Sequence, residues 1–382
     1  MLLAKPEISK MSQQKTPGFT VFDVRSFWLF FGGYKTFFSL FAFFVYNKFS
    51  SLGDTDQYIN GWSGITAESF YKPTQMMETF GGLIGVITRY SWLANIPFLL
   101  LSMYGTWYAI KRLRLSRNQA LIILILLLLP TYNIWTGIVS KESVGNFFMG
   151  VIAGYFIDIY RDKRLLPNIL EIVAFYLAAV FKPQYLIALA HVWVILALAR
   201  RLNGKFILFI GLVLFGLDIY LLYFNREIIG EFSLVMEIFF DPMAASTRPN
   251  DIWVQKFDVF TNAPYGMLIA FVGPTLREAM DKPLQMMVFI ESLFILAVML
   301  LIIGKMAYRN VVAGTFSPAR FFMLFFSFLW LMAVHYPFGA LNPGSAVRYR
   351  ENFYLYLVVM LIFCLSTNGK KYSNASIDLA SD

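Results

Sequence analysis

Charged residues are scarce in this chain, and histidine and cysteine are scarcer still. Only 14% of the 382 residues are charged, whereas an ordinary soluble domain carries about 25%. The single cysteine, Cys364, excludes an intramolecular disulfide, and two histidines leave no zinc-type cluster. The sequence also lacks a P-loop or another glycine-rich nucleotide motif, which argues against a reaction that consumes ATP or a nucleotide sugar. The polar N-terminal segment predicts no cleavable signal peptide.

Apolar sequence, by contrast, is abundant. Hydrophobic residues make up 58% of the chain, and its 40 Phe and 21 Tyr are typical of lipid-facing helices with interfacial belts. Runs long enough to cross about 30 Å of hydrocarbon lie near 28–48, 91–110, 119–138, 144–160, 168–182, 185–199, 205–224, 286–304, 319–336 and 351–366. We therefore expect an all-α, polytopic transmembrane helix bundle of about ten spans. Prolines and glycines interrupt one further stretch, 264–276, which we expect to be re-entrant or juxtamembrane.

The basic residues are distributed unevenly between the loops. A net charge of +9 is compatible with nucleic-acid binding, but most Lys and Arg lie in short loops between apolar runs, where they fix orientation. With ten spans, the basic loops share one side with both termini: 111–114, 161–164, 200–205 and 305–309. The positive-inside rule makes that side cytoplasmic. Segments 1–27 and 367–382 are then expected in the cytoplasm, flanking one transmembrane domain at 28–366, and no nucleic-acid partner is expected.

The opposite, non-cytoplasmic side carries the residues that indicate chemistry. Its long loops are 49–90, 225–285 and 337–350. The first opens with Gly53-Asp54-Thr55-Asp56-Gln57-Tyr58 and continues as mixed aromatic and polar sequence, which suits amphipathic interfacial helices. Asp54 and Asp56 can divide labour, one as acid or base and the other binding a metal or orienting a hydroxyl. The alternative is a solvated loop, or an N-cap for a helix that starts near Gln57.

Cations on this side run against the charge bias and need another reason to be there. Lys141 and Glu142 lie between two spans, where they either pair locally and cap the next helix or contact a ligand. Lys182 follows an apolar run and precedes Pro183, which disfavours helix at its predecessor. Its ammonium either snorkels to the surface or meets an anion.

The densest cationic stretch on the outer side is Arg348-Tyr349-Arg350, which follows a Pro/Gly turn. Two guanidiniums one residue apart can grip a phosphate or pyrophosphate with forked donors. The alternative is that they pair with Glu351 and with carboxylates of other loops. The stretch is therefore a candidate phosphate site.

Two other residues complete the candidate set. His335 is a proton-transfer group or a satisfied residue at the end of a span, and Arg248 lies near Asp251 in the large outer loop. One acid pair and several cations thus converge on one face, beside a bundle that a lipid tail can enter. This combination suits an anionic lipid substrate whose head group is processed outside the cell.

A carboxylate directly after the first span, followed by an aromatic residue and interfacial helices, resembles the GT-C superfamily of integral-membrane glycosyltransferases. Their motif is commonly Asp-Glu-x-x-Tyr, and Asp54-Thr55-Asp56-Gln57-Tyr58 is similar with the second acid displaced by one. The resemblance implies that Asp54 is the catalytic base, with Asp56 as the fallback. It also implies a polyprenyl-phosphate or polyprenyl-diphosphate sugar donor, with its phosphate held by Lys141, Lys182, Arg348 and Arg350.

The stretches 140–143 and 342–350 are similar to bacterial surface-polysaccharide proteins of the Wzy type. Together these features predict a glycosyltransferase of the bacterial inner membrane. It would move a sugar or glycan from the polyprenyl-linked donor to a hydroxyl of a glycan or glycolipid acceptor on the periplasmic or extracellular side. Asp56 assists Asp54 or binds a divalent metal such as Mg or Mn. Repeat-unit polymerisation, or transport of a lipid-linked oligosaccharide by a flippase, is the alternative.

Overall fold

The computed structural model describes residues 24–239, 247–314 and 316–366, and within them every regular element is a helix. The two terminal segments expected in the cytoplasm therefore fall almost entirely outside the described residues, at 1–23 and 367–382. The all-α prediction is confirmed for the described part of the chain.

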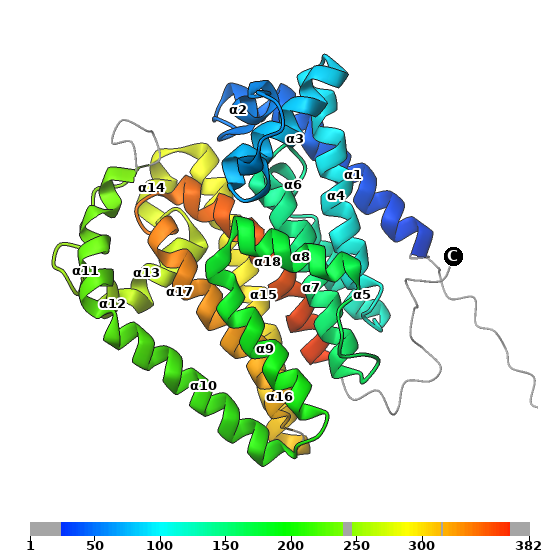
Figure 1. The fold of residues 1–382 in the computed structure, drawn as a ribbon, viewed down its shortest axis with the longest axis vertical. Coiled ribbons are helices and arrows are strands. Elements are labelled where there is room, and N and C mark those ends of the chain that lie inside the picture. Colours follow the sequence, from blue (N-terminus) through cyan, green and yellow to red (C-terminus); the bar gives the residue numbers. More distant parts are fainter. Residues whose placement is uncertain (1–23, 240–246, 315, 367–382) are drawn as a thin grey trace, which may run out of the picture.

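The first half of the chain forms nine α-helices. Their bounds are α1 Val24–Phe44, α2 Thr55–Asn60, α3 Pro73–Thr88, α4 Ser91–Ile110, α5 Arg117–Leu127, α6 Pro130–Thr136, α7 Lys141–Tyr160, α8 Ile169–Phe181 and α9 Leu186–Ala199. Short 3-10 turns lie at Tyr46–Lys48, Ala67–Phe70 and Pro183–Tyr185. Helices α2 and α3 lie in the long segment 49–90, at one end of the molecule (Figure 1).

The second half continues in the same way. Its helices are α10 Gly204–Phe224, α11 Arg226–Val235, α12 Asp258–Thr261, α13 Ala263–Val272, α14 Leu276–Asp281, α15 Pro283–Ala313, α16 Pro318–Phe321, α17 Ser327–Gly339 and α18 Pro343–Leu365. A 3-10 turn at Met236–Phe239 follows α11, and a π-helical turn at Phe322–Phe326 joins α16 to α17.

Length and composition identify six helices able to cross a membrane, or up to eight if each of two bent pairs counts as one span. The expected number was ten. One difference is at 168–182 and 185–199, which form the pair α8 and α9, bent by 117° at Lys182. With 13 and 14 residues, each helix reaches only about 20 Å, less than the hydrocarbon thickness of about 30 Å.

The last expected span, 351–366, begins earlier than the sequence indicated. It belongs to α18, which starts at Pro343 because Asn342 caps it, its side chain accepting from the Ser345 amide at 2.9 Å. The helix thereby includes Arg348, Arg350 and Glu351, and it is not among the candidate spans. The stretch 264–276 mostly forms α13, whose ten residues are likewise not among them.

Helices α7 and α18 form the centre of the bundle, because nearly all of their residues are buried, and other helices face outward. In the most apolar 18-residue stretch of α7, 94% of the residues are buried. The corresponding share in α10, at the periphery, is 17% (Figure 1). Helix α4 packs closely on α7 because glycines face each other: a Cβ on Gly150 would lie 2.4 Å from the Gly105 carbonyl oxygen. Small residues allow such backbone approach between membrane helices. Helix α7 is therefore packed by its neighbours along its whole length, from one end of the bundle to the other.

Candidate functional site

Segment 49–90, the first long loop, is held against the start of α7. The Thr55 hydroxyl donates to the carbonyl oxygens of Leu52, at 2.9 Å, and Val139, at 3.0 Å. Ser140 caps α7, because its hydroxyl accepts from the Ser143 amide at 3.1 Å. Residues 53–58 and 141–142, distant in sequence, are thus held side by side.

Arg348 joins these two segments to α18. Its Nη2 donates to Asp54 Oδ2 at 3.1 Å, and its Nε donates to Glu142 Oε1 at 3.0 Å. The Glu142 side chain is 1% exposed and that of Asp54 is 46% exposed. Glu142 therefore holds the Arg348 guanidinium from the protein interior, and Asp54 contacts it from the solvent-accessible side. The expected proximity of Asp54 and Arg348 is found.

Asp54 occupies the N-cap position of α2, but its side chain makes no capping hydrogen bond. Its Oδ2 instead accepts from the Tyr58 hydroxyl at 2.9 Å as well as from Arg348. Burial by itself raises the pKa of the Asp54 carboxyl, but Arg348 and Tyr58 together hold that pKa below its ordinary value. Asp54 is consequently a carboxylate at neutral pH. Within the described chain no protein group donates a hydrogen bond to its Oδ1.

Gly53 is required where Arg348 meets the loop. Its φ is +63°, and a Cβ there would lie 2.1 Å from Arg348 Nη1. Only glycine adopts this backbone conformation without steric strain. The glycine of the motif thus makes room for the guanidinium beside the carboxylate.

Two lysines flank this arrangement. Lys141 Nζ donates to Thr74 Oγ1 at 2.9 Å and lies 5.6 Å from the centre of the Tyr58 ring. Lys182 Nζ, at the break between α8 and α9, lies 4.5 Å from the centre of the Tyr349 ring. Among the described residues, neither lysine has a carboxylate within ion-pair distance. Both ammonium groups are therefore available to an anionic ligand.

We refer to these residues as the Asp54 cluster: Asp54, Tyr58, Lys141, Glu142, Lys182, Arg348 and Tyr349. One buried atom in it, Glu142 Oε2, has no hydrogen-bond partner within the described chain. The cluster thus combines an exposed carboxylate, two ammonium groups without ion pairs and a buried acceptor with unused capacity.

The second acid of the motif lies apart from the first. Asp56 is exposed on α2, where its backbone oxygen accepts from the Asn60 amide group at 2.9 Å. In the described part of the chain, no group of three or more His, Cys, Asp or Glu residues is arranged to hold a metal ion. A metal role for Asp56 stays a prediction.

Arg348 and Arg350, expected to grip one phosphate together, point to different sides of α18, and Arg350 pairs with Glu351, as the alternative had it. Both residues lie inside α18, and positions two apart on a helix are rotated by about 200°. Arg350 accordingly points into the bundle, where Nη2 donates to Glu351 at 3.0 Å and Nη1 donates to Ser292 Oγ at 2.8 Å and to the Phe271 carbonyl oxygen at 3.0 Å. The sequence placed both residues before the span, so this rotation was not foreseen.

Arg248 and His335 also lie outside the Asp54 cluster. Arg248 makes a forked ion pair with Glu278, at 2.9 and 2.8 Å, and donates to the carbonyl oxygens of Ala340 and Gly273. His335 is buried in α17, with Nε2 2.9 Å from the Ala270 carbonyl oxygen. Their contacts tie outer segments of the second half together.

Sequence reasoning missed a buried charged network around Arg350. Glu291 on α15 accepts from the Thr131 hydroxyl and lies 4.0 Å from Arg350. Lys35 on α1 is fully buried and donates to the Thr136 hydroxyl. In both cases the sequence could have indicated the residue, because a single ionisable residue stands inside an apolar run. Such a residue costs free energy in a membrane and usually has a function.

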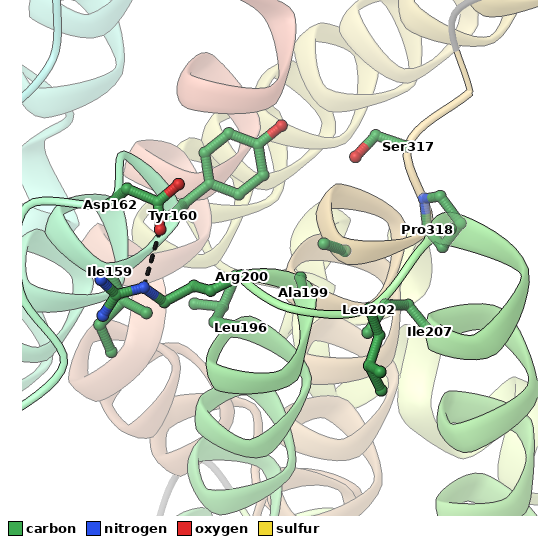
Figure 2. Close-up of a pocket in the computed structure, with 12 residues that line it drawn as sticks. Ile159, Tyr160, Asp162, Leu196, Ala199, Arg200, Leu202, Ile207, Ser317 and Pro318 are labelled. Atoms are coloured by element: carbon green, nitrogen blue, oxygen red, sulfur yellow. Dashed lines mark hydrogen bonds and ion pairs between the residues drawn. The ribbon is translucent and has the colours of Figure 1, made fainter.

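Two cavities lie at the far end of α7 from Lys141. One, of about 330 Å³, is lined by the ends of α7, α9, α10 and α16, and in Figure 2 the Arg200 guanidinium pairs with Asp162 at its edge, at 2.7 Å. The other, of about 310 Å³, is lined mainly by basic residues. Neither is lined by a residue of the Asp54 cluster.

A comparison of the chain with protein-family models, with curated proteins and with solved structures finds no match. The chain's own residues are therefore what bears on its function.

Proposed function

We propose that this chain is a membrane glycosyltransferase with a GT-C-like bundle of membrane-spanning helices. It moves a sugar or glycan from a polyprenyl-phosphate or polyprenyl-diphosphate donor to an acceptor hydroxyl on the non-cytoplasmic side of a bacterial inner membrane. The observation that carries the proposal is the Asp54 cluster, in which an exposed carboxylate lies beside Arg348 and two lysines without ion pairs. Phosphate next to a carboxylate-activated hydroxyl is what such a transfer needs.

Each group has a role in the reaction. Asp54 Oδ1 accepts a hydrogen bond from the acceptor hydroxyl, whose oxygen attacks the anomeric carbon of the donor sugar. The bond between that carbon and the phosphate oxygen breaks, and the proton passes to Asp54. Lys141 and Lys182 neutralise the negative charge that develops on the leaving phosphate. Arg348 fixes the direction of the Asp54 carboxylate.

The low pKa of Asp54 bears on the timing of proton transfer. A carboxylate held ionised by Arg348 and Tyr58 is a weak base, so it takes the proton late, after bond formation to the sugar has made the hydroxyl acidic. Binding of a divalent cation by Asp56 stays part of the proposal, and loss of transfer in EDTA with recovery in Mg²⁺ is its test.

Replacing Asp54 is the direct test of the proposed reaction. Asp54→Asn keeps the shape of the side chain but removes the base, and we expect transfer from a polyprenyl-phosphate sugar to fall at least about a hundredfold. The assay uses protein reconstituted in vesicles and follows labelled product. Glu68→Gln is the matched control, because Glu68 is an exposed carboxylate of the same outer loop, paired with Lys72. Transfer by Asp54→Asn at the wild-type rate would remove Asp54 as the base.

A flippase of lipid-linked oligosaccharide is the second candidate, and two observations favour it. Transporters carry ionisable groups on broken helices inside the membrane, and here two candidate spans are bent, by 66° and 117°. Glu291, Arg350 and Glu351 form a buried network within the bundle, and Lys35 is buried as well. Translocation of labelled lipid-linked oligosaccharide in liposomes, without a covalent product, would favour this function over transfer.

A further inference from the structure

The smaller cavity, at the end of α7 remote from the Asp54 cluster, has an unusual lining. Its volume is about 310 Å³, and five of the seven residues that line it are cations: Lys111, Arg112, Arg114, Arg161 and Lys163, with Leu113 and Asp158. The volume is at the lower end of the range of roughly 300–1,000 Å³ for small-molecule pockets. The residues come from the loop after α4 and from the C-terminal end of α7 and the loop that follows it.

The single acid of this basic pocket is already engaged. Asp158 pairs with Arg112 at 2.7 Å and with Lys163 at 3.0 Å, and Arg164 approaches it at 3.4 Å. Among the described residues, Lys111, Arg114 and Arg161 have no carboxylate within ion-pair distance. Lys111 Nζ instead lies 3.8 Å from the centre of the Trp107 ring. The pocket thus holds more positive charge than the protein neutralises.

The like charges act on each other. Burial first, and then the neighbouring cations Arg112 and Lys163, lower the pKa of Lys111. Burial and Arg114 lower that of Arg161 in the same way. The positive-inside rule accounts for cations on a cytoplasmic face, but it does not require them to line one concavity at the expense of mutual repulsion. A bound anion would relieve that repulsion.

The position of the pocket indicates where the anion comes from. Helix α7 has 20 residues and is about 30 Å long, so the pocket lies one hydrocarbon thickness from Lys141. It is at the end of two candidate spans, Ser91–Ile110 and Lys141–Tyr160. That depth is the level of lipid head groups in the opposite leaflet. Basic pockets between transmembrane helices on this side are suited to anionic lipid head groups.

We propose that this basic pocket binds the phosphate of an anionic phospholipid head group, at a site separate from the Asp54 cluster. Arg114, Lys111 and Arg161 supply the charge, and Asp158 holds Arg112 and Lys163 in place around the cavity. A free phosphate offers the same chemistry without the acyl chains, so the test has to separate the two sources.

The test compares two double variants that remove the same charge from the same side of the protein. Arg114→Gln with Lys163→Gln changes two exposed residues of the pocket, and Arg117→Gln with Arg201→Gln changes two exposed cations outside it. The melting temperature of the full chain in detergent is followed during titration with phosphatidylglycerol, phosphatidylcholine or inorganic phosphate. We expect saturable stabilisation by phosphatidylglycerol only, with half-saturation about tenfold weaker in the pocket variant and unchanged in the control.

The remaining outcomes also decide the matter. Saturable stabilisation by inorganic phosphate, lost in the pocket variant, supports the phosphate site but assigns it to a soluble ligand in place of a lipid. Equal weakening in both double variants would show a general surface-charge effect and overturn the site. Equal stabilisation by phosphatidylglycerol and phosphatidylcholine would overturn it as well.

Discussion

Arg348 is the residue at which three distant parts of the chain meet. It contacts Asp54 from the first outer loop and Glu142 at the start of α7, and it belongs to α18. Its Cζ also lies 5.5 Å from the centre of the Trp135 ring. A guanidinium offers several donors in a fixed plane, so one side chain sets the direction of the exposed carboxylate and satisfies a buried one.

Gly53 gives a prediction at the same scale. Gly53→Ala places a methyl group against the Arg348 guanidinium, so we expect at least a tenfold loss of transfer. Gly64→Ala is the matched control, because Gly64 also has a positive φ, +93°, but a Cβ there meets nothing within 4 Å. Backbone strain of about 1–2 kcal/mol is shared by both variants. If both lost the same activity at equal stability, the contact between Gly53 and Arg348 would have no role.

Which residues matter could be predicted from the sequence where a local pattern marked them. The direction in which their side chains point could not. Asp54 was found as half of an acid pair directly after the first apolar run, and Arg348 was found because a cation in an outer loop breaks the charge bias. The separation of Arg348 from Arg350 was not foreseen, because it depends on α18 starting at Pro343. The partners of Glu291 and Lys35 could not be foreseen, because only tertiary packing brings Glu291 to Arg350 and Lys35 to Thr136.

At the scale of elements, α7 connects the two sites described above. Its first residues contribute Lys141 and Glu142 to the Asp54 cluster, and its last turn contributes Asp158 to the basic pocket. Hydropathy identified this helix and most other long ones, because an apolar run of about 20 residues is a strong signal. It did not identify the break at Leu127–Pro130, and it placed a break at Lys182 without its angle, since angles between helices are set by packing.

The close contact between α4 and α7 gives a prediction for stability. Gly150→Ala inserts a methyl group 2.4 Å from the Gly105 carbonyl oxygen, and overpacking of this kind typically costs about 1–3 kcal/mol. Gly216→Ala, on outward-facing α10, meets nothing within 4 Å and is expected to be neutral or stabilising by about 0.5–1 kcal/mol. Thermal unfolding in detergent compares them. Equal melting temperatures for the two variants would contradict the packing of α4 on α7.

At the scale of the whole molecule, charge separates the two ends of the bundle. The Asp54 cluster pairs its guanidinium with two carboxylates, whereas the basic pocket has five cations and one acid. The sequence predicted this asymmetry, because the positive-inside rule depends only on which loops carry Lys and Arg. The sequence predicted ten spans, whereas the length and composition of the folded helices support six to eight.

Membrane orientation is testable because the chain has one cysteine, Cys364, and it is buried. In a Cys364→Ala background, single cysteines are placed at the exposed positions Asp56 and Lys163. We expect a membrane-impermeant maleimide to label the cysteine at 56 in intact cells and the one at 163 only after permeabilisation. Labelling of both from outside would contradict the assignment of the two ends to opposite sides.

The central claim is that the Asp54 cluster holds the phosphate of a polyprenyl-linked donor. The most direct measurement is an experimental structure of the full chain in lipid with polyprenyl phosphate bound. The account predicts phosphate oxygens within hydrogen-bond distance of Lys141 and Lys182 Nζ, with Asp54 Oδ1 facing the space beside them. A phosphate bound only in the basic pocket at the far end of α7, or deep in the bundle at Arg350, would contradict it.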